Sequence, residues 1–156
     1  METLLYILEQ KGKAVHRTTP EATVLDAVDE MCRAKVGALL VMKGDKPIGI
    51  VSERDVLTRL VLARRNPAET KVADVMTSGV VCIPSTASPE QAMAIMTERH
   101  CRHLPVVRGG AVEGIISIGD LVRWASRHQE YEIRLLSEYL GGYPSNAPLP
   151  AHATSP

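Results

Sequence analysis

The stretch GIVSERD occupies residues 49–55, and a close copy, GIISIGD, occupies residues 114–120. Both place glycine, serine and aspartate at the same spacing, and the two copies are 65 residues apart. The same offset aligns further identical residues without a gap: Val15 with Val80, Ala22 with Ala87, Ala27 with Ala92, Met31 with Met96, Leu39 with Leu104, Val41 with Val106 and Gly44 with Gly109. A fixed internal period indicates a tandem repeat, so each half should contain the same elements.

Each half is predicted to contain a strand, a helix, two strands and a second helix, in that order. The first strand is placed at residues 13–18, and a helix at 24–35 follows a capping box formed by Thr23 and Asp26. Two apolar, β-branched runs, GALLVM and PIGIVS, indicate a hairpin, and a last helix is predicted at 53–63. The counterparts in the second half are a helix that starts at Ser88 and Pro89, the hairpin runs HLPVV and VEGIIS, and a helix at 118–127.

These elements predict an α/β (α+β) fold. Neither half is large enough to bury a good core alone, so the two βαββα repeats are expected to pack sheet to sheet with pseudo-twofold symmetry, with an added C-terminal helix. The predicted organisation is a first repeat with an N-terminal helix at 1–66, a second repeat at 67–127, a C-terminal amphipathic helix at 128–143 and a flexible tail at 144–156.

Composition limits the classes of function. Lysine and arginine total 18, as do aspartate and glutamate, so no net positive charge is present to attract nucleic acid or an anionic membrane surface. The start of the chain has no basic leading segment, and its apolar run is too short for a signal peptide or a membrane span. The three cysteines have no CxxC spacing and are expected to be buried thiols, so a cytoplasmic location and no metal site are predicted.

The serine and aspartate of the repeated stretch also have a purely structural interpretation. Ser52 with Asp55, and Ser117 with Asp120, have the spacing of a capping box, which satisfies backbone N–H groups at the start of a helix. On this interpretation alone, the chain would be a structural dimerisation module.

The doubled unit resembles a pair of cystathionine-β-synthase-type (CBS) domains, also called a Bateman module. The similarity covers about residues 13–127 and rests on VADVMT before the second copy, RHLPVV on its second strand and the repeated G-h-h-S-x-x-D turn, where h is apolar. The ending SIGDLVRW, followed by a Glu-rich helix and LGGYP, is similar to small stand-alone members. The resemblance implies a non-enzymatic sensor that binds AMP, ADP or ATP, in some members NAD(H) or S-adenosylmethionine, and reports its occupancy to a partner protein.

The resemblance also implies which residues contact the nucleotide. It assigns the ribose hydroxyls to Asp55 or Asp120 and a polar contact to Ser52 or Ser117, while N–H groups at the adjacent helix start would receive the phosphates. The remaining candidates are Thr18, Thr19, Ala22 and Thr23 around adenine in one site, Ile83, Pro84 and Ser88 around adenine in the other, and Arg54, Arg102, His103, Pro105 and Gly119.

The two sites are expected to differ in charge. Arg102 and His103 match a basic pair that holds phosphates in related sensors, whereas the equivalent positions in the first half are Gly37 and Ala38. Arg54 partly compensates for this difference, and the sequence does not assign Arg102 to one of the two sites. These arginines, and Arg99, can also be solvated surface charges, and His103 can be a core histidine.

An amphipathic helix is predicted at residues 126–140, with Tyr131, Leu135 and Tyr139 on one stripe widened by other apolar residues. This stripe either covers its own module or forms a dimer contact, and the resemblance favours a homodimer, described as a two-module disc. The glycines at 141–142 are expected to end the helix.

Three functions remain open: a nucleotide sensor, a structural dimerisation module and a nucleotide-processing enzyme. The sequence disfavours the enzyme, because it contains no Gly-rich P-loop and no plausible pairing of a nucleophile with a base. It does not identify the physiological ligand or the regulated partner.

Overall fold

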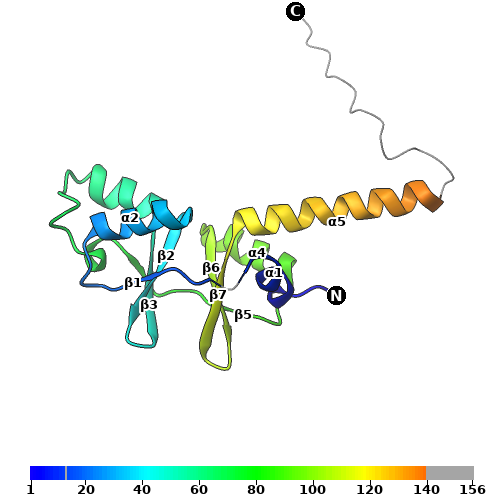
Figure 1. The fold of residues 1–156 in the computed structure, drawn as a ribbon, viewed down its shortest axis with the longest axis horizontal. Coiled ribbons are helices and arrows are strands. Elements are labelled where there is room, and N and C mark those ends of the chain that lie inside the picture. The colour runs from blue at the N-terminus through cyan, green and yellow to red at the C-terminus, as the bar shows by residue number, and fades with distance from the viewer. Residues whose placement is uncertain (13, 140–156) are drawn as a thin grey trace, which may run out of the picture. The chain divides into compact units, whose positions relative to one another are not determined.

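The computed structural model describes residues 1–12 and 14–139 (Figure 1), and these divide into two units, residues 1–121 and a second unit that begins at residue 122. The first unit contains both hairpins of the repeat. The expectations for Leu140, for the glycines at 141–142 and for the tail at 144–156 lie outside the described residues.

The first repeat forms a sheet in the order β1-β2-β3-β4. Strand β1 pairs parallel with β2, whereas β2 with β3 and β3 with β4 pair antiparallel. Gly44 turns the hairpin at a φ of 61°, in the left-handed region that favours glycine. The elements are β1 Arg17–Thr18, α2 Val24–Ala34, β2 Ala38–Lys43, β3 Lys46–Ser52, α3 Glu53–Asp55, the π-helix η1 Val56–Val61, the 3-10 helix η2 Val72–Asp74 and β4 Thr77–Ser78.

The second repeat forms a sheet in the order β5-β6-β7, and Figure 1 shows its hairpin, in yellow-green, pointing the same way as the cyan hairpin of the first repeat. Both hairpins break register at equivalent places, between Val41 and Met42 and between Val106 and Val107. The elements are β5 Ile83–Pro84, α4 Pro89–Arg99, β6 His103–Arg108, β7 Ala111–Ser117 and α5 Ile118–Tyr139. The predicted fold, two βαββα repeats with a C-terminal helix, is confirmed.

The predicted capping boxes start the first helix of each repeat. The Thr23 hydroxyl accepts the N–H of Asp26 at 3.1 Å, and the Asp26 carboxylate accepts the N–H of Thr23. Ser88 and Gln91 make the same pair of hydrogen bonds before α4, and Pro89 occupies the first helical position. Each cap satisfies donors that the helix itself leaves unpaired.

The helix predicted at residues 53–63 is irregular. After α3 the chain continues as a π-helix, in which the N–H of Leu62 donates to the carbonyl of Leu57 five residues earlier. Within this segment the Thr58 hydroxyl donates to the carbonyl of Arg54 at 2.8 Å.

The buried side chains repeat with the same offset as the sequence. Leu39 and Leu104 are at most 1% exposed on the equivalent strands β2 and β6, and Met31 and Met96 are buried on α2 and α4, as predicted. Strands β3 and β7 also share one alternating burial pattern. The periodic apolar residues therefore form the core.

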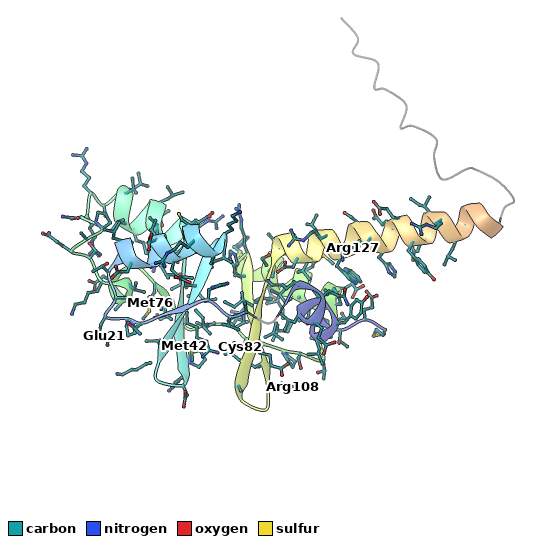
Figure 2. All side chains as sticks on the ribbon, in the orientation of Figure 1. Glu21, Met42, Met76, Cys82, Arg108 and Arg127 are labelled. Carbon is teal, nitrogen blue, oxygen red and sulfur yellow. The ribbon has the colours of Figure 1, made fainter. Side chains whose placement is uncertain are left out.

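The prediction that the three cysteines are buried is wrong. Cys32 and Cys82 are exposed, and Cys101 is half-buried. Cys32 follows the core residue Met31 on α2 and lies on the solvent-exposed face of that helix. Cys82, which Figure 2 labels, immediately precedes β5.

The N-terminal helix α1 (Leu4–Lys11) packs on the second repeat. The N–H groups of Leu4 and Leu5 donate to the carbonyls of Ala87 and Ser85 at 2.9 and 3.0 Å. Leu8 is fully buried against β7, where a Cβ atom on Gly114 would lie 2.6 Å from its side chain. The predicted boundary at residue 66 groups this helix with the first repeat, whereas these contacts join it to the second.

The segment around η2 has the same place on the first repeat. Ala22 and Pro20 are equivalent to Ala87 and Ser85. Their carbonyls accept hydrogen bonds from the N–H groups of Val72 and Ala73, at 2.8 and 3.1 Å respectively. Met76, labelled in Figure 2, lies against Gly49 as Leu8 lies against Gly114. Helix α1 therefore replaces, on the second repeat, the segment that covers the first.

In the second unit, the described residues continue α5 as one helix to Tyr139, instead of the two successive segments predicted. Tyr131, Ile133, Leu135 and Leu136 are exposed along it. Within residues 1–12 and 14–139, no helix has both the length and the apolar character needed to cross a bilayer.

Candidate functional site

A cavity of about 350 Å³ lies where β3 enters α3, and residues of both repeats line it. Its volume is within the range of small-molecule sites, roughly 300–1,000 Å³. The lining residues are Gly37, Ile50, Ser52, Glu53, Arg54, Asp55, Thr77, Gly79, Val80, Val81, Arg99, His100, Cys101, Arg102, His103 and Leu104.

Asp55 lines this cavity with its side chain 9% exposed. Its Oδ2 atom accepts the N–H and the hydroxyl of Ser52 at 2.9 and 3.1 Å, so the capping box is formed. Its Oδ1 atom accepts the hydroxyl of Thr77 at 3.1 Å. A carboxylate has about four acceptor positions, so about one remains for a ligand.

Thr77 is a site residue that the sequence analysis missed. It lies on β4, which pairs with β3 at Gly49 and Ile50 and so brings residues 77–81 to Asp55. Its hydroxyl can both donate and accept, so it can exchange its bond to Asp55 for a bond to a ligand hydroxyl.

Positive side chains form another part of the lining. Arg54 comes from the first repeat, and Arg99 and Arg102 come from the end of α4 and the residues before β6. All three are exposed residues. The structure therefore places Arg102, which the sequence could not assign, with Asp55 in one cavity.

His103 also lines the cavity, close to Glu53 and Gly37. Burial lowers the pKa of His103, and the positive charge of Lys11 lowers it further, against the opposing charges of Glu53 and Asp120. The ring is therefore neutral at pH 7, and nearby anionic phosphate would favour its protonation.

Three of the N–H groups at the helix start, which were expected to receive phosphate, already donate to groups of the protein. The N–H groups of Ser52 and Asp55 bond within the capping box, and the N–H of Glu53 donates to the carbonyl of Gly37 at 3.0 Å. Arginine side chains are the remaining cationic groups of the cavity.

Asp120 and Ser117 form the equivalent cap on the second repeat, but they are not among the residues that line this cavity. The ammonium group of Lys11 donates to Asp120 Oδ2 at 2.7 Å and to the carbonyl of Ile115 at 2.8 Å. Burial opposes ionisation of Asp120, but the hydrogen bonds from Lys11 and Ser117 outweigh it and lower the pKa of the carboxyl group.

The adenine residues predicted for the first site lie elsewhere. Ala22 and Thr23 pair with the segment at Lys71 and Val72, through the Ala22 carbonyl and a bridge between Thr23 and Lys71. The other predicted residues that do not line the cavity are Thr18, Thr19, Ile83, Pro84, Ser88, Pro105, Ser117, Gly119 and Asp120.

Several of these residues have a structural role that explains their position. Ser88 caps α4, Ile83 is 2% exposed on β5, and Pro105 is buried on β6. Val80 and Val81, just before the predicted strand residues, line the cavity instead. Val80 and Val81 reach the cavity because β4 pairs with β3. The local sequence pattern around them does not indicate this pairing, so they could not be predicted from it.

The lowered pKa of His103 predicts how stability depends on pH. The unfolded state takes up a proton near its ordinary pKa of 6.5, before the folded state does, so the free energy of unfolding should decrease as pH falls through about 6.5. His103→Gln should remove that part of the decrease. Urea unfolding of both proteins at several pH values measures it, and identical pH profiles would contradict the assignment.

Known proteins with similar sequences or structures were compared with this chain. A family model described as CBS domain matches residues 13–62 and 72–127. The CBS domain-containing protein CBSX3, mitochondrial, of Arabidopsis thaliana is 37% identical over 153 residues, covering 90% of this chain and 73% of that protein. A CBS domain crystal structure, NE2398, has a TM-score of 0.76 at 39% identity and covers 80% of this chain and 97% of its own. The structure of CBSX2 in complex with AMP has a TM-score of 0.66 at 24% identity, covers 81% and 98%, and shares the fold.

Proposed function

The chain belongs to the CBS domain family of regulatory modules, and from this premise we propose that its Asp55 cavity binds an adenosine nucleotide and transmits occupancy to a partner protein. One observation carries the proposal: Asp55 of the first repeat and Arg102 of the second line the same cavity. A nucleotide has a sugar diol and an anionic phosphate, which match a carboxylate and a guanidinium group, respectively.

The ribose lies at Asp55 and Thr77 in this proposal. One ribose hydroxyl donates to the remaining acceptor position of Asp55, and the second bonds to the hydroxyl of Thr77. The adenine ring packs on apolar lining residues, namely Val80, Val81 and Leu104. This assignment replaces the predicted adenine residues at 18–23 and 83–88.

The phosphates lie at Arg54, Arg99 and Arg102. A guanidinium group can donate two parallel hydrogen bonds to phosphate, so these side chains favour a charged nucleotide over adenosine. The cavity of about 350 Å³ is near the lower end of the usual range, which favours AMP, ADP or ATP over the larger NAD. AMP is present in the structure of CBSX2, so AMP is the first ligand to test.

We propose that nucleotide binding regulates the partner protein and that the chain does not catalyse a reaction of the nucleotide. A ligand held by both repeats stabilises one packing of the repeats over others, and a partner that distinguishes the packings then responds to nucleotide concentration. A structural dimerisation module is the second candidate, since every predicted Ser-Asp pair does cap a helix. A nucleotide-processing enzyme stays the least favoured alternative.

Calorimetry on protein freed of carried-over ligand tests the proposed function. Titration with AMP, ADP, ATP and NAD is expected to give saturable binding for at least one mononucleotide. If none of the four binds up to millimolar concentration, the sensor is refuted and the structural module is favoured. Product formed from ATP or NAD above background would instead support an enzyme.

Arg102→Gln tests the phosphate contact. Hydrogen bonds to charged groups contribute about 1.5–3 kcal/mol, so the variant should bind AMP about 10-fold more weakly or worse, with little change for adenosine. Arg33→Gln is the matched control, because Arg33 is an exposed residue of α2 paired with Asp29. Equal losses for AMP and adenosine would show that Arg102 does not contact the phosphate.

Two further predictions belong to this proposal. We propose that the exposed apolar residues of α5, including Tyr131 and Leu135, contribute to a homodimer, and sedimentation equilibrium would measure its mass.

The cytoplasmic location stays a prediction from the sequence. A fluorescent fusion of the natural protein would test it.

A further inference from the structure

The turns at Ser52–Asp55 and Ser117–Asp120 form the same capping box, but a different group donates a further hydrogen bond to each aspartate. At Asp55 the added hydrogen-bond donor is the neutral hydroxyl of Thr77, at 3.1 Å, and the cation Arg59 lies further away, with its Nε atom 3.9 Å from Oδ1. At Asp120 the added donor is the ammonium group of Lys11, at 2.7 Å. The Asp120 side chain is 4% exposed and the Lys11 side chain 33%, so the carboxylate is shielded from water whereas Lys11 still reaches solvent.

We propose that Lys11 is a specificity determinant that restricts nucleotide binding to the Asp55 cavity, so that each chain binds one nucleotide instead of two. Its ammonium group pairs with Asp120 Oδ2 and competes with a ribose hydroxyl for that carboxylate. This inference rests on the proposed function, because it assumes that the repeated aspartate is the ribose contact.

The chemistry of exchange differs between the two turns. At Asp55 a ribose hydroxyl can take the remaining acceptor position, or that of the Thr77 hydroxyl, without displacing a charged donor. At Asp120 it would replace an ion pair, in which the donor and the acceptor are both charged. It would also leave the Lys11 ammonium group without its buried counter-charge.

Lys11 is held in place by a docked helix. It is the last residue of α1, and Leu4 and Leu8 of that helix are fully buried on the second repeat. The main-chain hydrogen bonds from Leu4 and Leu5 fix the same helix. Helix α1 fixes the position of Lys11. A ligand that binds Asp120 would therefore have to break the ion pair while Lys11 stays beside it.

Native mass spectrometry with AMP tests the inference by counting ligands per chain. The unmodified chain should bind one AMP, and Asp55→Asn should lose it at the same concentration. Lys11→Ala should bind two, Lys11→Ala with Asp55→Asn should bind one, and Lys11→Arg, which keeps the charge, should bind one. Circular dichroism checks that each variant is folded.

Other counts would overturn the role of Lys11. Two AMP per unmodified chain would show that the second turn binds with Lys11 in place, and one AMP retained by Asp55→Asn would contradict the Asp55 contact on which the inference rests. Neither measurement needs a Lys11 variant. A single AMP on folded Lys11→Ala would contradict the inference as well. No AMP on either the unmodified chain or Lys11→Ala would refute the proposed function itself.

Discussion

Asp55→Asn is expected to weaken AMP binding by about 10- to 100-fold. The substitution preserves the size of the side chain and leaves an oxygen that can accept the Ser52 N–H, but it removes the negative charge. Hydrogen bonds to charged groups contribute about 1.5–3 kcal/mol, and every 1.4 kcal/mol is about tenfold in affinity. Isothermal titration calorimetry measures the dissociation constant of each protein.

Asp26→Asn is the matched control for this loss. Asp26 has the same place in the capping box of α2, with Thr23 as its partner, and it does not line the cavity. Its AMP affinity should equal that of the unmodified chain. Unchanged affinity in Asp55→Asn would contradict the ribose contact, and equal losses in both variants would assign the effect to helix capping.

Leu8→Ala should lower the free energy of unfolding by about 2–5 kcal/mol, as for other buried leucines. Leu8 is fully buried where α1 meets β7, so its truncation leaves a cavity beside Gly114. Gly114→Ala alone should also destabilise, because its new methyl group would lie 2.6 Å from Leu8. Urea unfolding measures both free energies.

The double variant distinguishes a specific contact from two independent losses. The methyl group of Gly114→Ala should fill part of the space left by Leu8→Ala, so the double variant should lose less stability than the sum of the two. Gly49→Ala is the control, because its methyl group would instead meet Met76 and the Thr77 carbonyl. Additive losses for Leu8 with Gly114 would contradict the docking of α1.

The parts of the fold that could be predicted are those that depend on neighbouring residues, such as caps and hairpins, or on the internal repeat. The caps at Thr23 and Ser88 depend on residues three positions apart, and both are present. The hairpins follow from apolar runs separated by a glycine turn, and both are present. The second repeat is recognised by its offset alone.

The parts that were missed depend on contacts between distant residues. Strand β4 is two residues long, so no alternation marks it, and it forms only because β3 offers an edge. This pairing brings Thr77 to Asp55, whereas β1, which begins the segment predicted around adenine, lies at the opposite edge of the sheet. The contact of Lys11 with Asp120 joins residues 109 positions apart, which no spacing within one repeat could reveal.

A crystal structure of the chain with AMP would test the central claim most directly. The account predicts a ribose hydroxyl within hydrogen-bond distance of Asp55, phosphate oxygens at Arg54, Arg99 or Arg102, and an intact ion pair between Lys11 and Asp120. AMP bound only at Asp120, or bound in the cavity with its ribose away from Asp55, would contradict it.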